Sequence, residues 1–243
     1  MPQPSDKAAL RGEPSYVWRT GQERRLNLIR AAAPQLDNAK ILENGCGLGM
    51  YVAKLSQFSS HVFGFDYELE RVIAGGRTLD KLACAAGEHL PYPANTFAVM
   101  LSNEVIEHVQ DDVAAVHEMV RTLRVGGRLV LFCPNRWYPV ETHGIYWRGQ
   151  YHFGNFPLVN YLPDPLRNKL APHVRAYTRR GLRRLFDSLP VKIVHHSIIF
   201  GGYDNIIARR GAAGKLIRAI LYLLENTPLQ ILGLSHFLVV EKF

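Results

Sequence analysis

The stretch Ala39–Tyr51, AKILENGCGLGMY, decides how this chain folds. A short apolar run leads into an acid, Glu43, and then into three glycines at alternate positions, Gly45, Gly47 and Gly49. Glycines in a turn between a strand and a helix let the backbone approach a bound nucleotide closely, and the first amides of the helix point into the same site. The stretch therefore predicts a strand, a ligand-binding loop and a helix, in that order.

The spacing of these glycines separates two kinds of nucleotide site. A dinucleotide fingerprint, G-x-G-x-x-G, places its third glycine one residue later, where this chain has Met50. Glu43 would repel a pyrophosphate but suits a ligand that carries an ammonium group. The pattern E-x-G-x-G-x-G resembles motif I of the class I methyltransferases that use S-adenosylmethionine (SAM), with a purely structural glycine turn as the alternative. The resemblance implies that SAM is bound by the loop residues Glu43, Gly45, Cys46, Gly47 and Gly49.

An acid also ends the second expected strand, HVFGFD at residues 61–66. At this place Asp66 can accept hydrogen bonds from two ribose hydroxyls, and Tyr67 can lie against adenine. The family often has a further acid two residues before Glu88, but this chain has Ala86 there. The adenine amino group is therefore left to Glu88, to the backbone or to a water molecule.

The end of the fourth expected strand, residues 97–103, is a further candidate site. Open parallel sheets bind ligands at the carboxyl ends of their strands, so Asn103 is expected at the mouth of the pocket. Glu107 and His108 are expected to open the next helix, where His108 either reaches the substrate or caps the helix. The resemblance to the methyltransferases is continuous over residues 40–135.

Residues 136–176 are rich in aromatic residues, His, Pro and Gly, and they have no regular period. A connection of this length at the carboxyl edge of a sheet is typical of a lid or a substrate pocket. Its first part, PNRWYPVETH, resembles a segment of the small-molecule O-methyltransferases in the type 11 group. Glu141 and His143 are close enough in sequence for His143 to act as a general base that Glu141 orients, because imidazole titrates near neutrality. The alternative is that His143 only packs the lid.

The resemblance implies an α/β fold: a doubly wound, Rossmann-like, seven-stranded mixed sheet with helices on both faces and an antiparallel last strand. Residues 1–15 are polar and Pro-rich, so a flexible arm without a targeting signal is expected there. Residues 16–243 are expected to form one methyltransferase domain that carries the insertion at about 136–176. Within it, the patterns predict helices at 16–33, 50–57, 70–82, 111–123, 177–188 and 214–225, and strands that include 40–43, 191–208 and 235–243. The helix at 70–82 is expected to be interrupted or loosened at Gly75–Gly76, the strand at 191–208 to be broken or bulged at Gly201–Gly202, and Thr178 to cap the helix at 177–188.

Charge and cysteine content narrow the class of protein. The formal net charge of +8 points toward a nucleic acid, an anionic membrane surface or an acidic substrate. The three cysteines lie far apart without metal-ligand spacing, which favours a reducing compartment such as the cytoplasm and predicts no metal site. No apolar run reaches the roughly 18 residues needed to span a bilayer. The apolar face of residues 214–225 suits a core, a dimer contact or a peripheral contact with a membrane.

The favoured function is SAM-dependent O-methylation of a small molecule, such as a sugar, a quinone precursor or a lipid-linked glycan. One alternative is an RNA methyltransferase. The net charge favours it, but the chain has no RRM or KH motif and reads S-N-E-V where D-P-P-Y or N-P-P-Y is expected. The other alternative is a non-catalytic SAM-fold binding protein, for which loss of Glu43 or Asp66 would be the sign; both acids are present.

Overall fold

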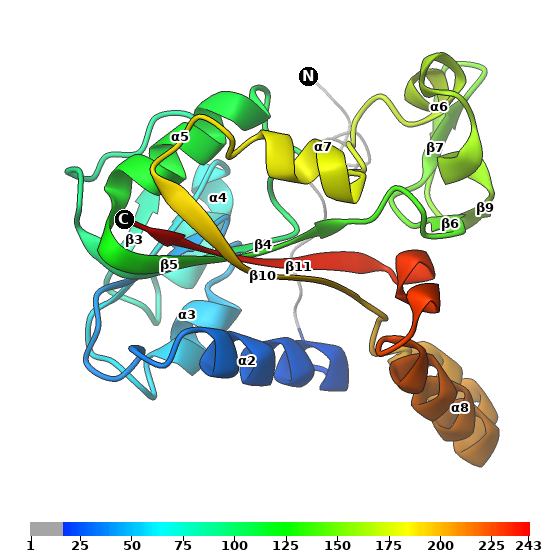
Figure 1. Cartoon of the computed structure of the whole chain (residues 1–243), viewed down its shortest axis with the longest axis horizontal. Coiled ribbons are helices and arrows are strands. Elements are labelled where there is room, and N and C mark those ends of the chain that lie inside the picture. Colours follow the sequence, from blue (N-terminus) through cyan, green and yellow to red (C-terminus); the bar gives the residue numbers. More distant parts are fainter. Residues whose placement is uncertain (1–16) are drawn as a thin grey trace.

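The computed structural model describes residues 17–243, so the arm expected at residues 1–15 lies outside the described residues. A seven-stranded sheet crosses the molecule in the order β10-β11-β5-β4-β1-β2-β3 (Figure 1). The last strand, β11 (Ser235–Lys242), is antiparallel to both neighbours, and the other strand pairs of this sheet are parallel. The predicted doubly wound α/β sheet is confirmed. The remaining strands are β1 (Ile41–Asn44), β2 (Val62–Asp66), β3 (Leu82–Cys84), β4 (Phe97–Asn103), β5 (Leu123–Pro134) and β10 (Val191–Ile199).

Helices cover both faces of the sheet. One face packs against α2 (Thr20–Ala32) and α3 (Met50–Leu55), and the other against α5 (Asp112–Thr122) and α7 (Arg179–Arg184). Figure 1 shows the first pair below the sheet and the second pair above it. The central strands β1 and β4 are buried along nearly their whole length, as parallel strands are when helices cover both faces. This burial explains why the first five residues of β4, residues 97–101, form a continuous apolar run in the sequence.

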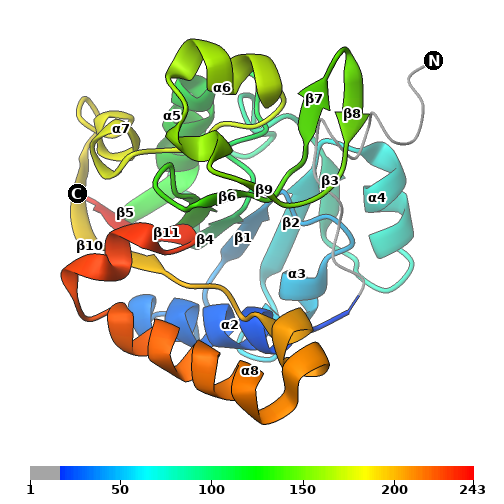
Figure 2. The ribbon, with the colours of Figure 1, turned by 90° about the vertical axis from the view of Figure 1, so that its right-hand side faces the viewer.

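The segment between β5 and α7 forms small local structures at the end of the sheet where the parallel strands terminate (Figures 1 and 2). Two short antiparallel pairs, one 3-10 turn and one helix make up this segment. These elements are β6 (Val140–Glu141) with β9 (Phe156–Pro157), β7 (Ile145–Trp147) with β8 (Gln150–His152), η1 (Val159–Tyr161) and α6 (Asp164–Leu170). The segment therefore stands where an open α/β sheet binds its ligand.

Several predicted boundaries in the first half of the chain are wrong. The helix expected at 70–82 is α4 (Leu69–Gly75), because a glycine pair ends it and the chain then forms β3. A side chain at Gly75 would lie 2.9 Å from the Leu48 carbonyl oxygen, so the end of α4 packs closely on the glycine loop. Glu107 and His108 do not open a helix. They lie in the β4–α5 loop, because α5 begins at residue 112 after an Asp111 cap that accepts from the Ala114 amide.

Two boundaries in the second half are wrong as well. The strand expected at 191–208 ends at Ile199, and α8 (Asp204–Leu224) begins soon after the Gly201–Gly202 turn. α8 is kinked at Gly211, and the part after the kink corresponds to the helix predicted at 214–225. Gly202 lies against α2, where an added Cβ would be 2.7 Å from the Gly21 Cα. Figure 2 shows α8 running beside α2, and the Arg24 side chain of α2 pairs with Glu225 just after α8. By contrast, the predicted Thr178 cap of α7 is confirmed by its 3.0 Å bond from the Gly181 amide.

Candidate functional site

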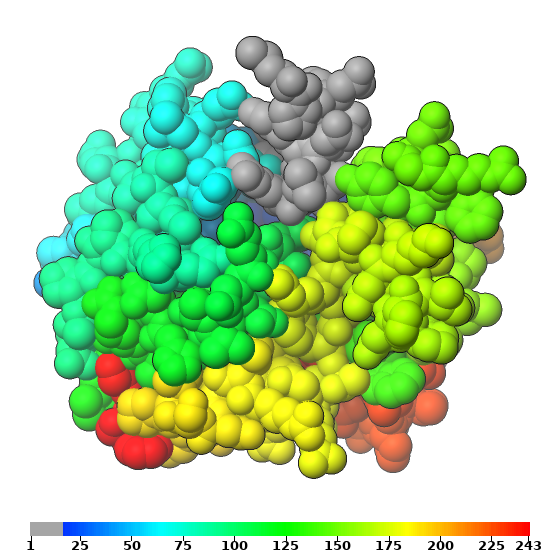
Figure 3. Space-filling view, turned by 90° about the horizontal axis from the view of Figure 1, so that it is seen from above, coloured from blue at the N-terminus to red at the C-terminus, as the bar shows by residue number. Residues whose placement is uncertain are grey.

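A cavity of about 810 Å³ opens at the carboxyl ends of β1, β2 and β4. Its wall contains the glycine loop, the end of β2, residues 85–89, the β4–α5 loop and one side chain of the insertion, His143. Figure 3 looks onto the molecule from above, where the segments after β2 (cyan), the β4–α5 loop (green) and the insertion (yellow-green) converge. This is the edge at which open parallel sheets bind ligands.

The three loop glycines all adopt left-handed backbone conformations, with φ of 70° at Gly45, 55° at Gly47 and 82° at Gly49. A Cβ on Gly45 would lie 2.3 Å from the Val105 side chain, so only glycine fits there. Gly45, Cys46 and Gly47 line the cavity, but Gly49 does not. Gly49 instead caps α3, and it shapes the loop without facing the cavity.

Glu43 lies in the cavity wall and is almost completely buried. The backbone amide of Val52, in the first turn of α3, donates to its carboxyl group. Its Oε2 atom has no hydrogen-bond partner among the described residues. Burial raises the pKa of Glu43 well above its ordinary value, and the neighbouring Asp66 raises it further. A buried carboxyl oxygen of this kind, set in a cavity wall, is suited to a cationic ligand.

Asp66 lies beside Glu43 at the end of β2, and it is buried too. Its Oδ2 accepts from the Gly47 amide at 2.8 Å, and its Oδ1 accepts from the Glu68 amide at 2.9 Å. The carboxylate therefore holds the glycine loop against β2 in the cavity wall. The next residue, Tyr67, also lines the cavity, and its side chain is 52% exposed.

Two other predicted cofactor residues line the cavity but already have partners in the protein. Glu88 accepts from the amides of Gln110 at 2.8 Å and Asp111 at 3.2 Å, so it holds the β4–α5 loop in place. Asn103 accepts a 2.5 Å hydrogen bond from the guanidinium of Arg25 in α2. These contacts were not visible in the sequence, because each partner comes from a distant segment.

Beyond Asn103 lie two acids: Glu104 lines the cavity, and Glu107 lies behind its wall. Glu104 has a φ of 56°, and its Oε1 binds the Arg25 guanidinium at 2.6 Å and the Ser235 hydroxyl at 2.9 Å. Burial opposes its charge, but Arg25, His143 and Ser235 together outweigh burial, and the pKa of Glu104 is lowered. Glu107 is 1% exposed, and its carboxyl oxygens accept no hydrogen bond of normal geometry in the described part of the chain. Burial and the adjacent Glu104 charge raise the pKa of Glu107 well above its ordinary value.

The predicted catalytic histidines meet at this end of the cavity. His108 and His143 both line it, with ring centroids 5.5 Å apart in an edge-on arrangement. Ligand-type atoms of Glu107, His108 and His143 all lie within 4.8 Å of one another. Burial lowers the pKa of His108 to about 4, and the nearby His143 contributes to the shift, so His108 is neutral at physiological pH.

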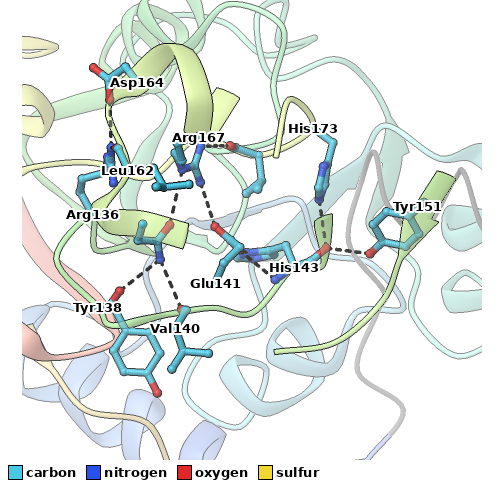
Figure 4. Close-up of polar contacts among 12 residues, drawn as sticks. Arg136, Tyr138, Val140, Glu141, His143, Tyr151, Leu162, Asp164, Arg167 and His173 are labelled. Carbon is cyan, nitrogen blue, oxygen red and sulfur yellow. Dashed lines mark hydrogen bonds and ion pairs between the residues drawn. The ribbon is translucent and has the colours of Figure 1, made fainter. Parts of the chain in front are cut away.

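Glu141 does not line the cavity; it lies behind His143 and orients it (Figure 4). The Nδ1 atom of His143 lies 2.9 Å from Oε1 of Glu141, and the His143 amide donates to the same oxygen. The other oxygen accepts from the Arg167 guanidinium at 2.9 Å. Burial opposes the charge of Glu141, but His143 and Arg167 outweigh it and hold its pKa at about 2. Because this ionised group only accepts, Nδ1 of His143 carries the proton and Nε2 is left for the cavity.

The backbone of His143 is held as firmly as its ring. Its carbonyl oxygen accepts from the Tyr151 hydroxyl at 2.7 Å and lies 3.0 Å from Nε2 of His173 (Figure 4). Arg167 also donates to the Val174 carbonyl oxygen at 2.6 Å. The insertion thus fixes one side chain at the cavity through a buried polar network. Sequence reasoning missed Arg167, Tyr151 and His173, because nothing in their local pattern links them to His143.

Comparison with known proteins extends these observations. Residues 42–131 match a family model described as a methyltransferase domain. The demethylmenaquinone methyltransferase of Beutenbergia cavernae is 31% identical over 197 residues, which cover 77% of this chain and 76% of that protein. The ubiquinone biosynthesis O-methyltransferase of Aliivibrio fischeri is 25% identical over 119 residues, or 46% of this chain and 51% of that protein. The chain spans about half the length of several curated relatives that it matches.

Solved structures share the fold at low sequence identity. A SAM-dependent methyltransferase from Mesorhizobium loti superposes with a TM-score of 0.63 at 17% identity, covering 89% of this chain and 96% of that one. A geranyl diphosphate methyltransferase, solved with its substrate GPP and sinefungin, gives a TM-score of 0.63 at 15% identity, covering 91% of this chain and 79% of that one. These likenesses agree with the relative that matches three quarters of both sequences, and the chain belongs to the class I SAM-dependent methyltransferase family.

Proposed function

We propose that this protein transfers the methyl group of SAM to an oxygen atom of a small-molecule acceptor. One observation carries the proposal. A single cavity joins the glycine loop and Glu43 at one end to His108 and His143 at the other. The first end has the character of a cofactor site, and the second has groups that act on a hydroxyl.

The residues present fit SAM. Glu43 offers a buried oxygen that has no partner among the described residues, which suits the ammonium group of the methionine moiety. The loop from Gly45 to Gly47 offers a backbone that a ligand can approach closely, since Gly45 leaves no room for a side chain. Asp66 and Tyr67 both line the cavity at the end of β2, which suits a carboxylate that accepts from ribose hydroxyls and a ring that lies against adenine. Glu88 and Asn103 act more by fixing the surrounding loops, because they already have partners in the protein.

When bound, SAM supplies an activated methyl group: an O–CH₃ bond forms, the S–CH₃ bond breaks, the sulfonium becomes a neutral thioether and the hydroxyl proton leaves. The protein has to align the reacting atoms and exclude water. The insertion suits the second task, since it stands over the strand ends and carries His143 into the cavity wall. His143, oriented by Glu141, is placed to handle the hydroxyl proton, with His108 beside it.

Two of the relatives described above are named for methylation in quinone synthesis, and one of them is an O-methyltransferase. These names support a hydroxylated ring as the acceptor. A pair of histidines favours oxygen over carbon or a basic amine, because a hydroxyl must lose a proton as it is methylated. The sequence carries no RRM or KH motif, so the small molecule is preferred.

The test is direct. The protein is incubated with methyl-labelled SAM and a panel of catechols, quinols, monophenols and sugars, and labelled products are identified by mass spectrometry. O-methylated product that disappears in the Glu43→Gln variant is expected. Tight SAM binding without transfer to any member of the panel or of a cell extract would favour the non-catalytic alternative. Transfer to RNA alone would replace the small-molecule proposal.

A further inference from the structure

We infer that Glu107, His108 and His143 form a binding site for a divalent transition-metal cation at the acceptor end of the cavity. This inference rests on the proposed function and deepens it, because such a cation selects acceptors that carry two adjacent oxygen atoms. The sequence predicts no metal site, since its three cysteines lie far apart without metal-ligand spacing. The fold brings these residues together from two separate segments.

The distances suit one ion. Ligand-type atoms of the three side chains all lie within 4.8 Å of one another. Nitrogen and oxygen ligands at about 2.0–2.2 Å from one ion in tetrahedral geometry are about 3.4 Å apart. Binding therefore draws the three side chains together by about an ångström. Two imidazoles with one carboxylate form a donor set that zinc, manganese or iron accepts and that magnesium, which prefers oxygen ligands, does not favour.

The donor atoms are also short of partners. Both carboxyl oxygens of Glu107 and Nδ1 of His108 are buried without a normal hydrogen bond among the described residues. Buried polar atoms nearly always have a hydrogen-bond partner, and leaving one without a partner lowers stability. Glu107 lies behind the cavity wall, whereas His108 and His143 line the cavity. A cation bound by all three side chains would give these three buried atoms their missing partner.

Neighbouring residues hold the three candidate ligand side chains in place, as the residues around the ligands do in known metal sites. Nδ1 of His143 is engaged by Glu141, which leaves Nε2 for an ion, and Arg167 holds Glu141 in turn. A hydrogen bond with the His173 backbone engages the His108 ring. When a histidine binds a metal through one ring nitrogen, a carboxylate or backbone group that binds the other nitrogen fixes the tautomer and the orientation of the ring. The Glu104 carboxylate, which Arg25 and Ser235 hold in place, lies beside Glu107 and adds negative charge.

The acceptor class follows from the coordination number. Three protein ligands leave open positions on such an ion, and the ion faces the cavity that also contains the glycine loop. A catechol or another compound with two adjacent hydroxyls fills two of these positions. The ion then lowers the pKa of the hydroxyl that it binds, so the proton passes to solvent before the oxygen takes the methyl group. In this arrangement His143 is a metal ligand, and its Nε2 is not free to act as the general base.

The first experiment measures metal binding directly. Metal-stripped full-length protein is titrated with Zn²⁺, Mn²⁺ and Mg²⁺ by calorimetry at pH 7, and the metal content after dialysis is measured. We expect about one Zn²⁺ or Mn²⁺ per chain, with Mg²⁺ weaker. Glu107→Gln and His143→Asn should each weaken binding by at least about tenfold. His152→Ala removes an exposed histidine of the same insertion and should change nothing. Equal affinity in all four proteins, or no uptake, would overturn the inference.

The second experiment separates this inference from the proposed function. SAM affinity and methyl transfer to a catechol and to a matched monophenol are measured before and after metal removal. The inference expects SAM affinity to persist, catechol methylation to stop, and added Zn²⁺ or Mn²⁺ to restore it. Undiminished methyl transfer by the metal-stripped protein would overturn the metal site but support the proposed methyltransferase activity, with His143 as the general base. Metal uptake without transfer to any acceptor would overturn the proposed function and leave the site standing.

Discussion

The Oδ2 atom of Asp66 accepts a hydrogen bond from the Gly47 amide over 2.8 Å, so the end of β2 and the glycine loop are joined within the protein itself. The Glu68 amide holds the other oxygen of the same carboxylate. Asp66 thus fixes the loop in the left-handed conformation that its glycines adopt. A loop that is ordered in advance binds its ligand without a further cost in conformational entropy.

Because of this bond, replacing Asp66 tests two roles at once. Asp66→Ala should weaken SAM binding strongly and lower the free energy of unfolding by about 1.5–3 kcal/mol, since it removes hydrogen bonds to a buried charge. Calorimetry with S-adenosylhomocysteine and its 2′,3′-dideoxy analogue separates the roles. If Asp66 binds the ribose, the protein prefers the natural ligand and the variant loses that preference. A preference that survives in the variant limits Asp66 to holding the loop.

The raised pKa of Glu43 predicts that the affinity for SAM depends on pH. Its pKa is raised well above the ordinary value by burial, so the carboxyl group is protonated over a range in which a free glutamate is ionised. The ammonium group of SAM favours the charged form, so binding releases a proton and affinity rises with pH until the free carboxyl ionises by itself. Calorimetry in buffers of different ionisation enthalpy measures that proton.

The matched variant is Glu43→Gln, which keeps the shape of the side chain. Its affinity for SAM should be lower by a factor of about 30 or more, because loss of one partner of a buried charge pair costs at least about 2 kcal/mol of binding free energy. It should also release no proton in this pH range. A pH dependence of affinity that is the same in both proteins would assign the ammonium group to another residue.

Replacement of His143 should separate cofactor binding from turnover. His143→Ala leaves the glycine loop, Glu43 and Asp66 untouched, so the affinity for SAM should stay within about twofold. Turnover should fall by about 10²-fold or more, which is the usual effect of losing a group that handles the transferred proton or holds its acceptor. Equal losses of SAM affinity and turnover would mean that His143 contacts the cofactor and not the acceptor.

The buried ion pair behind His143 predicts a loss of stability. Arg167 and Glu141 are 3% and 2% exposed, and their side chains meet at 2.9 Å. Arg167→Ala leaves the Glu141 charge buried without its partner, which costs about 3–5 kcal/mol. Urea unfolding and limited proteolysis within residues 136–176 measure the effect. Arg148→Ala, at an exposed site of the same insertion, is the control. Equal unfolding curves for the two variants would mean that the pair adds nothing to stability.

Sequence reasoning was most accurate where one local pattern decides the structure. The residues of β4 are as predicted because a fully buried strand reads as an apolar run, and the glycine loop is defined by its own spacing. It was wrong after β10, where the Gly201–Gly202 turn against α2 starts a helix that local propensity did not reveal.

For the site, the cofactor end was accessible from motifs, but the contacts of the acceptor end were not. His108 and His143 were both named, yet their meeting with Glu107 depends on how the insertion folds back over the strand ends. The partners of Glu104 and Glu141 are equally remote in sequence, since Arg25 comes from α2 and Arg167 from α6. Such contacts leave no periodic signal in a single sequence.

The α8–η2 surface, formed by α8 and η2 (Pro228–Leu232), predicts a contact with anionic lipid. No helix in residues 17–243 has the length and apolar content to cross a bilayer. The surface nevertheless exposes the apolar side chains of Leu216, Ile217, Ile220, Leu223, Leu229, Ile231 and Leu232. Arg209, Arg210 and Lys215 are exposed on the same helix. Apolar and basic residues together favour binding to an anionic membrane surface.

The protein should therefore co-sediment with vesicles that contain phosphatidylserine, less so as salt is raised, and only weakly with neutral vesicles. Leu216→Glu combined with Leu223→Glu should abolish this binding, because both exposed side chains would then repel the lipid surface. Val113→Glu, at an exposed apolar residue of α5, is the matched control and should bind as the wild type does. Sedimentation that stays at background for the wild type, or equal binding by all three proteins, would leave the α8–η2 surface without a role at the membrane.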